Sequence, residues 1–228
     1  MKVLVACESS GVVRDAFRKL GHDAWSCDLL PADDNTDTTY HIQGDVLTHD
    51  MGIRNPRWDL VIAHPPCTYL CCSGIHWMKQ RPKETPEEQE IERLRVEKRK
   101  EDQKKAIEFF MEFTKLKCKW CIENPMGIMS TKYRSPNQYI QPYQFGHDAS
   151  KKTGLWLHGL PKLIPTKEIP PRLVTDAKTG KVRKRWANQI DSGQNRLGPS
   201  SDRWKIRSKT YEGIAKAMAE QWGKEFKF

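Results

Sequence analysis

Apolar and polar positions follow two different periods through the first half of the chain. Short apolar runs bounded by turn-forming residues, which are typical of strands, are interspersed with segments whose apolar residues recur at helical spacing. The predicted strands are 2–7, 22–29, 41–47, 58–64 and 118–124, and the predicted helices of this half are 11–21 and 84–117. Strands that alternate with helices predict an α/β protein with a doubly wound sheet.

The segment 84–117 is the strongest predicted helix. Thr85 is suited to cap its start and Pro86 to occupy its first turn, and glutamates follow where the helix dipole favours negative charge. Its apolar side chains are expected to form a buried face, and these are Ile91, Leu94, Ala106, Phe109, Phe110 and Phe113.

The periodicity weakens in the second half of the chain. The segments 139–146 and 153–161 are typical of loop and strand, whereas 164–203 is basic and rich in proline, with a turn signal in 176–183 that predicts a two-stranded finger. A closing helix is predicted at 209–223, with an apolar face formed by Ile214, Ala215, Met218 and Trp222. We therefore predict three parts, which are a Rossmann-like core at 1–161 with a mixed sheet, a small basic appendage at 162–203 and a C-terminal helix at 204–228 that returns to the core.

Composition and charge narrow the class of protein. Hydrophobic residues make up 37% and charged residues 30% of the 228 positions. No apolar run reaches the roughly 18 residues that a membrane helix needs, and the N-terminus is not typical of a signal peptide, so no membrane association is expected. The formal charge of +10 predicts a polyanionic partner, with nucleic acid the first candidate, and no obligate protein partner is evident.

The cysteines indicate a reduced compartment. The chain has seven, an odd number, and Cys71 and Cys72 are adjacent, so a disulfide framework is not expected and a cytoplasmic location is. Cys118 and Cys121 have a spacing typical of zinc ligands. However, no second pair follows, and strand alternation directs the two thiols to opposite faces, so no metal site is predicted.

Polar side chains follow several of the predicted strands. Glu8, Asp28, Asp45 and Cys67 come at strand ends, and parallel strands bring such ends to the one edge of a sheet where α/β proteins bind ligands. Each has an ordinary alternative, such as a solvated aspartate or a buried structural thiol. Cys67 differs because two prolines stiffen the turn before it, and a thiolate nucleophile has to be aimed in one direction.

Glu123 and Asn124 occupy the end of the strand 118–124. If that strand neighbours 58–64, Glu123 lies beside Cys67, where a carboxyl group is able to protonate or hydrogen-bond a heteroaromatic ring. The alternative is an acid that caps a helix or forms an ion pair.

Three motifs occur in order along the chain, "GDV" at 44–46, "HPPC" at 64–67 and "IENP" at 122–125. They resemble the ordered motifs of the cytosine-C5 DNA methyltransferases, in particular short phage-type members with a reduced target-recognition region. The resemblance implies a Rossmann-like fold, S-adenosylmethionine as cofactor and double-stranded DNA with a flipped base as substrate. It also implies that Cys67 adds to C6 of the cytosine, Glu123 contacts N3 and the amine, and Asn124 holds the turn around Cys67.

The resemblance assigns further residues to the cofactor and to DNA. The implied cofactor pocket consists of Cys7, Glu8, Ser9, Gly11, Asp28, Asp45 and Pro65, with Ser208 and Thr210 from the last helix. The implied DNA contacts are Trp77, Arg81, Lys151, Lys152, Arg183, Lys184, Arg185 and Trp186. The chain departs from the family pattern in its first turn, "CESSG", which has a serine where a glycine is usual, and at Thr68, where a glutamine is usual.

Two other functions stay open on the sequence. The same chemistry on a free cytosine nucleotide or on RNA suits the small recognition region. A catalytically inactive module that protects DNA by occupancy suits the basic charge. The basic finger favours a polymer over a nucleotide, and the presence of Cys67 and Glu123 together favours an enzyme of DNA modification or restriction-modification. In a phage-encoded protein that activity takes place in the host cytoplasm.

Overall fold

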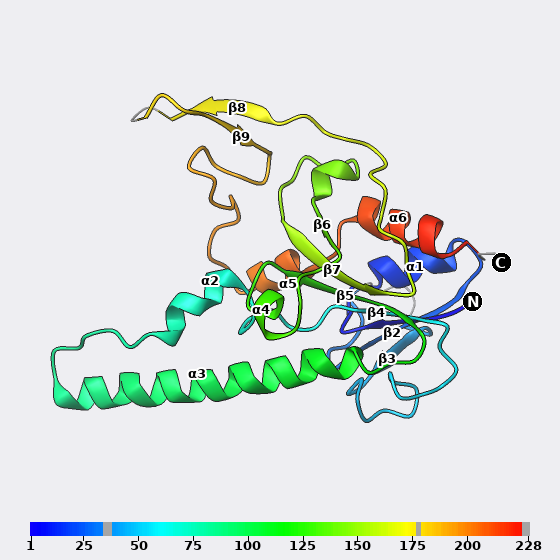
Figure 1. Ribbon diagram of the computed structural model, residues 1–228, viewed down its shortest axis with the longest axis horizontal. Coiled ribbons are helices and arrows are strands. Elements are labelled where there is room, and N and C mark those ends of the chain that lie inside the picture. Colours follow the sequence, from blue (N-terminus) through cyan, green and yellow to red (C-terminus); the bar gives the residue numbers. More distant parts are fainter. Residues whose placement is uncertain (34–37, 177–178, 225–228) are drawn as a thin grey trace.

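The computed structural model describes residues 1–33, 38–176 and 179–224, and a seven-stranded sheet forms its centre (Figure 1). The strands are β1 Lys2–Ala6, β2 Asp23–Asp28, β3 His41–Gln43, β4 Leu60–Ala63, β5 Lys119–Pro125, β6 Gln138–Ile140 and β7 Thr153–His158. Their order is β3-β2-β1-β4-β5-β7-β6, and only the pairs that include β7 are antiparallel. This mixed, mostly parallel sheet confirms the predicted α/β class and is compatible with a Rossmann-like fold.

Helices cover both faces of the sheet. Figure 1 shows α1 (Val12–Arg18) and α6 (Glu212–Trp222) on one face and α3 (Pro86–Phe113) on the other. The shorter helices are α2 Cys72–Ile75, η1 His76–Met78, α4 Met129–Lys132, η2 Pro142–Gln144 and α5 Arg203–Ser208. The segment 204–224 forms α5 and α6 rather than one helix, and α6 packs beside α1.

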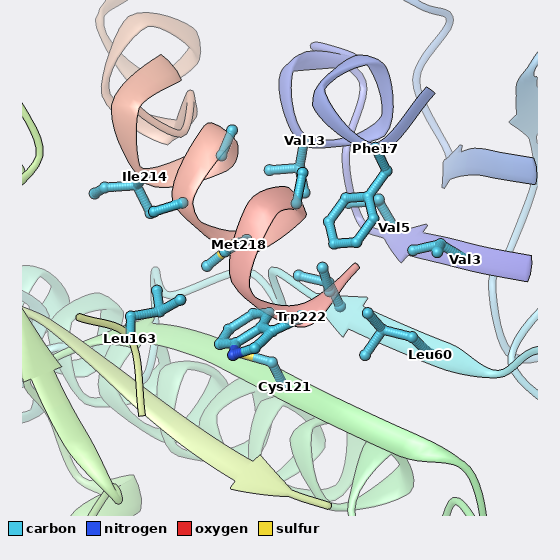
Figure 2. Packing of buried hydrophobic residues seen from close by; sticks show 14 of the residues in the cluster. Val3, Val5, Val13, Phe17, Leu60, Cys121, Leu163, Ile214, Met218 and Trp222 are labelled. Atoms are coloured by element: carbon cyan, nitrogen blue, oxygen red, sulfur yellow. The ribbon is translucent and has the colours of Figure 1, made fainter. Parts of the chain in front are cut away.

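Alternation along the strands divides the core in two. Val3 and Val5 of β1 pack with α1 and α6, in the cluster that Figure 2 shows around Trp222. Leu4 and Ala6, the residues between and after them, pack with Phe110 and other side chains of α3. Because both faces are covered, all of β4 and every position of β1 after Lys2 are buried, and these strands read as unbroken apolar runs. Cys121 and Cys118 belong to opposite clusters, as the alternation predicts.

The long helix α3 starts as predicted but is buried over less of its length. The Thr85 hydroxyl accepts the backbone N–H of Glu88 at 3.2 Å, and Pro86 is the first helical residue. The prediction that Ile91 and Leu94 are buried is wrong, because their exposed fractions are 67% and 51%. Only the C-terminal part of α3 lies under the sheet, whereas the N-terminal part extends beyond it (Figure 1).

The basic appendage contains the predicted finger. β8 (Arg172–Thr175) and β9 (Val182–Arg185) form an antiparallel hairpin that stands apart from the main sheet (Figure 1). Part of the predicted turn, residues 177–178, lies outside the described residues. The segment before the hairpin is packed against the core, since Leu163 is buried in the cluster with α6. Within the described residues, no helix combines the length and apolar character needed to cross a membrane.

Candidate active site

The sheet order brings the loops after β1 and β4 together. β1 pairs with β2 on one side and with β4 on the other, so the chain changes direction across the sheet between these strands. In open α/β sheets, this point at the carboxyl ends of the strands is where ligands bind. The backbone N–H of His64 donates to the carbonyl of Ala6 at 2.9 Å, which joins the two loops directly.

The first turn has an unusual backbone. Cys7 has a φ of 59° and Gly11 a φ of 68°. Glycine adopts this left-handed region without a steric penalty, whereas a cysteine there stores of order 1 kcal/mol of strain. The backbone N–H of Cys7 holds the turn by donating to the carbonyl of Cys27 at 2.7 Å. A backbone conformation that costs energy to maintain favours a ligand-binding role for this turn, as predicted.

Glu8 has a structural role that the sequence does not indicate. Its carboxylate accepts the backbone N–H groups of Val13 at 2.7 Å and Arg14 at 3.2 Å, and it is 4% exposed. Burial raises the pKa of Glu8, while nearby His64 is the largest influence in the opposite direction. The carboxylate therefore caps α1, and its oxygens are occupied by these backbone groups.

Asp28 and Asp45 lie near each other at adjacent strand ends. Asp28 ends β2 and accepts the backbone N–H of Leu30 at 2.9 Å, and Asp45 follows β3 and accepts that of Leu47 at 2.9 Å. The pKa of the Cys7 thiol is raised, first by burial and then by the charge of Asp28, with Asp45 contributing in the same direction. Burial also raises the pKa of Asp28. The three predicted cofactor groups are thus brought together, with carboxylate oxygens left to accept hydroxyl hydrogens.

A loop after β2 connects the first turn to the C-terminal helices. The backbone N–H of Asp33 donates to the carbonyl of Ser9 at 2.8 Å. The Asp33 carboxylate, which is almost fully buried, lies 2.8 Å from Nζ of Lys205 and 3.8 Å from Nζ of Lys209. No sequence signal singled out Asp33, because its partners come from α5 and the segment just after it.

Ser208 and Thr210 have separate roles. The Ser208 hydroxyl donates to the carbonyl of Lys205 at 2.8 Å and closes the end of α5. The Thr210 hydroxyl instead donates to the Glu123 carboxylate. Thr210 therefore belongs to the group around Glu123, whereas the sequence assigned both residues to the cofactor.

The turn that presents Cys67 is anchored from the neighbouring strand. Nδ2 of Asn124 donates to the carbonyl of Pro65 at 2.7 Å, and Asn124 is fully buried. The backbone N–H groups of Leu70 and Cys71 both donate to the carbonyl of Cys67 at 3.0 Å. Asn124 thus holds the proline turn from one side and a helical turn holds it from the other, while the Cys67 side chain stays partly exposed.

Glu123 lies against His64 rather than alone. His64 Nδ1 is 2.7 Å from Glu123 Oε2, and the two side chains are 12% and 11% exposed. Burial disfavours the charged form of both side chains, but their mutual attraction outweighs this effect. The positive charge of His64 is the main cause that lowers the pKa of Glu123 to about 2. The hydrogen bond to Glu123 is the main cause that raises the pKa of His64. Since Ala63 pairs with Ile122, the next residues on the two strands fall side by side, which explains the contact.

Cys67 has a second thiol as its neighbour. The contact with Cys71 is the largest influence that raises the pKa of the Cys67 thiol, and burial follows. Cys71 shows the opposite shift, because hydrogen bonds from Cys67, the Ser73 hydroxyl at 3.1 Å and the backbone of Gly74 lower its pKa to about 5. A nucleophilic role needs a thiolate at Cys67, whereas these shifts favour the thiolate at Cys71.

The two predicted lysines of the 149–157 segment have different partners. Lys151 donates to the carbonyl of Arg207 at 3.0 Å, and its positive charge lowers the pKa values of both Glu123 and Cys67. Nζ of Lys152 instead lies 4.4 Å from the centre of the Tyr139 ring. Lys151 therefore lies with Cys67, Cys71, Glu123 and His64, which together are called the strand-end group. Lys152 instead lies against an aromatic face.

The other predicted DNA contacts lie outside this group. Trp77 is exposed in η1, with the guanidinium of Arg81 4.0 Å from its ring centre. In the hairpin, Arg183 lies 3.5 Å from Asp176, and Lys184 is exposed. Arg185 donates from Nε to the carbonyl of Asp191 at 2.9 Å.

Trp186 anchors the hairpin instead of standing free. Its ring stacks on Tyr143 with centroids 4.1 Å apart and an angle of 9°, and Nε1 donates to the carbonyl of Ile169 at 3.2 Å. One face of this ring is therefore already covered by the core. The more exposed tryptophan of the region is Trp204.

These contacts gather a cysteine pair, a carboxylate, a histidine and a lysine at the strand ends of an α/β protein whose sheet is compatible with a Rossmann-like fold. Within the described residues, no group of three or more histidine, cysteine or acidic side chains is arranged to hold a metal ion. Comparison of the chain with protein-family models yields no match, and comparison with curated proteins yields none either. The activity therefore has to be argued from the strand-end group itself.

Proposed function

We propose that the protein transfers a methyl group from S-adenosylmethionine to C5 of cytosine in double-stranded DNA. The observation that carries this proposal is the juxtaposition of Cys67, on a turn held by Asn124, with Glu123 on the adjacent strand. The order and residue types are those of the methyltransferases that the sequence resembles. A doubly wound sheet with one reversed strand next to its edge also supports a methyltransferase fold.

The residues at the ends of β1, β2 and β3 fit the proposed cofactor. Asp28 and Asp45 would accept the ribose hydroxyls, and backbone groups of the first turn around Ser9 would face the methionine part. Buried Pro65 offers an apolar surface for adenine. S-adenosylmethionine, when bound, supplies the electrophilic methyl group that the activated C5 takes.

The strand-end group supports covalent activation of the base. Addition of the Cys67 sulfur to C6 breaks the aromaticity of the ring and makes C5 nucleophilic. Glu123 is positioned to contact N3 and the amine, while the charge of Lys151 favours the ionised forms of Cys67 and Glu123. Cys71 is hydrogen-bonded to Cys67 and would accept the Cys67 proton as the sulfur bonds to C6.

The exposed groups support a nucleic-acid substrate. A base has to leave the duplex to reach Cys67, and an aromatic or guanidinium side chain is suited to fill the gap. Trp77 and Arg81 follow Cys67 on the next exposed segment. The hairpin presents Arg183 and Lys184 to phosphates, which favours double-stranded DNA over a free nucleotide.

A label-transfer assay tests the proposal. Tritiated S-adenosylmethionine is incubated with duplex DNA, RNA or dCMP and with wild type, Cys67→Ser or Cys72→Ser protein. We expect label in DNA with wild type and with Cys72→Ser, which changes an exposed cysteine outside the strand-end group, and none with Cys67→Ser.

Other outcomes assign other functions. If only dCMP or RNA is labelled, the proposed reaction is supported, but its substrate is a nucleotide or RNA instead of DNA. No label, together with salt-sensitive DNA binding, identifies a binding module. DNA that contains 5-fluorocytosine adds a direct test, because fluorine cannot leave as a proton; the absence of a denaturant-resistant complex would contradict attack by Cys67.

A further inference from the structure

His64 is a nearly buried ionisable group beside Glu123, and the proposed steps leave it without a role. It follows β4 directly, and its Nδ1 lies 2.7 Å from Oε2 of Glu123. Its Nε2 is buried and has no hydrogen-bond partner among the described residues. Within the part of the chain that the structure describes, Glu123 is therefore the one group that hydrogen-bonds the ring, and it offers the route by which a proton on Nδ1 leaves.

The proposed chemistry needs a proton that Glu123 alone does not hold. Addition of a thiolate to C6 becomes easier when N3 of the ring takes a proton. The pKa of Glu123 is lowered to about 2, chiefly by the charge of His64 against the effect of burial, so its carboxyl group is ionised at neutral pH. A proton donated to N3 at neutral pH must come through Glu123 from another group.

The charges around His64 favour storage of that proton. Burial and the positive charge of Lys151 lower the pKa of His64. Glu123 on β5 and Glu8 in the first turn raise it by more, so the pKa of His64 lies above its ordinary value of 6.5. The partly exposed thiol of Cys67 follows three residues later, on the other side of the proline turn. The ring is thus held between two carboxylates and one ammonium group.

We propose that His64 is a positioning residue that stores the proton which Glu123 delivers to N3 of cytosine. The inference rests on the proposed function. As the Cys67 sulfur bonds to C6, the C5=C6 electron pair moves toward C4, the Nδ1 proton of His64 passes to the ionised carboxylate of Glu123, and a proton passes from Glu123 to N3. The thiolate and the imidazolium therefore lose their charges in the same step.

The proton returns when the product forms. After C5 has been methylated, its hydrogen leaves as a proton to solvent, the C5=C6 bond forms again and the sulfur departs as a thiolate. N3 then gives its proton back to Glu123, and Glu123 gives it to His64. The dyad ends each cycle in its starting ionic state, and only the C5 proton is released.

The test replaces His64 by asparagine, whose amide N–H occupies roughly the place of Nδ1 but does not titrate. His158→Asn is the matched control, because His158 is exposed at the opposite end of the sheet, where it pairs with Trp120 at the start of β5. Single-turnover label transfer to DNA is measured over a range of pH with saturating cofactor, together with DNA affinity and thermal unfolding.

We expect His64→Asn to transfer label about 100-fold more slowly than wild type near neutral pH, with DNA affinity unchanged. The wild-type rate falls as pH rises through the pKa of His64. The variant rate already falls about tenfold per pH unit through the neutral range, because its proton must come from Glu123 itself. A purely structural role would slow the reaction without this change in pH profile.

The outcomes separate the two proposals. If wild type labels no substrate, the proposed function fails and the relay fails with it. If wild type labels DNA and His64→Asn has the same rate and pH profile, the relay alone is overturned. If the variant does not fold, a nitrogen-15 NMR titration of the His64 ring in the wild-type protein tests the proposal instead. A ring that is already neutral at pH values below 6.5 overturns the proposal, and so does a ring pKa that Glu123→Gln leaves unchanged.

Discussion

The strand-end group and the basic hairpin are held in place by opposite means. His64, Glu123 and Asn124 are buried, and each is joined to a partner on a neighbouring strand or turn. The hairpin exposes apolar Leu173 and Val182, and the ring of Trp186 at its end stacks on Tyr143. Chemistry on a ring needs groups fixed in position, and burial provides that, whereas attraction to phosphates needs only charge in reach of solvent.

Because the two regions are held differently, variants in them should change different properties of the protein. Changes in the strand-end group should alter rate and stability with little effect on DNA affinity. Changes in the hairpin should alter affinity and its salt dependence with little effect on stability. An intact rate after loss of a buried partner, or a rate loss from the hairpin alone, would break this division.

The largest expected effect comes from Asn124→Ala. The substitution removes the donor to the carbonyl of Pro65 and leaves that oxygen buried and unpaired, which lowers the free energy of unfolding by about 2 kcal/mol. The freed turn displaces Cys67, so label transfer falls about 100-fold. The control is Asn55→Ala, which breaks an amide–carbonyl bond of similar length, 2.8 Å to Asp50, at an exposed site. Denaturant unfolding and the transfer assay check both values, and equal losses in the two variants would contradict the prediction.

A second effect, about tenfold, is expected at the thiols. Near neutral pH, wild-type Cys71 should react with iodoacetamide faster than Cys67, because the pKa of Cys71 is lowered to about 5 and that of Cys67 is raised. Cys71→Ser removes the neighbouring negative charge, lowers the pKa of Cys67 and speeds its alkylation about tenfold. Peptide mass spectrometry measures each site, with Cys72→Ser as control. Faster alkylation of Cys67 than of Cys71 in wild type would reverse the assignment of the thiolate.

The smallest effect is expected from Arg183→Ala combined with Lys184→Ala. Loss of two exposed positive charges should weaken DNA binding a few-fold and reduce the slope of log affinity against log salt by about 2, because fewer counterions are released. The unfolding free energy should not change. Lys100→Ala combined with Lys104→Ala, at two exposed positions of α3, removes the same number of positive charges and serves as control. Titrations at several salt concentrations compare the two, and equal slopes would remove the hairpin from the DNA interface.

The sequence predicted the elements well where short-range physics decides them. The apolar run 58–64 and the prolines after it indicate a strand followed by a stiff turn, and Thr85 with Pro86 marks the start of α3. Strand alternation with helices also predicted that Asp28 and Asp45 lie at one edge of the sheet, and the charges of both act on the Cys7 thiol there. Steric and hydrogen-bonding preferences of neighbouring residues are sufficient for these features.

Other features depend on partners that the pattern does not name. Ile91 and Leu94 fit a helical stripe, but nothing lies opposite them, because α3 extends past the sheet. Glu8 has the residue type of a ligand group, yet the N–H groups at the start of α1 occupy its oxygens. Trp186 fits a base-stacking residue, yet Tyr143 already covers one of its faces.

The chain alone determined which residues stand at strand ends, since period and turn chemistry act over a few neighbouring positions. The tertiary structure decided which of them touch. The pairing of Ala63 with Ile122 places His64 beside Glu123 and Pro65 beside Asn124, and the return of the chain after α5 adds Thr210. Such contacts join positions far apart in the chain, and they are selected by the packing of the whole sheet and its helices, which no local pattern encodes.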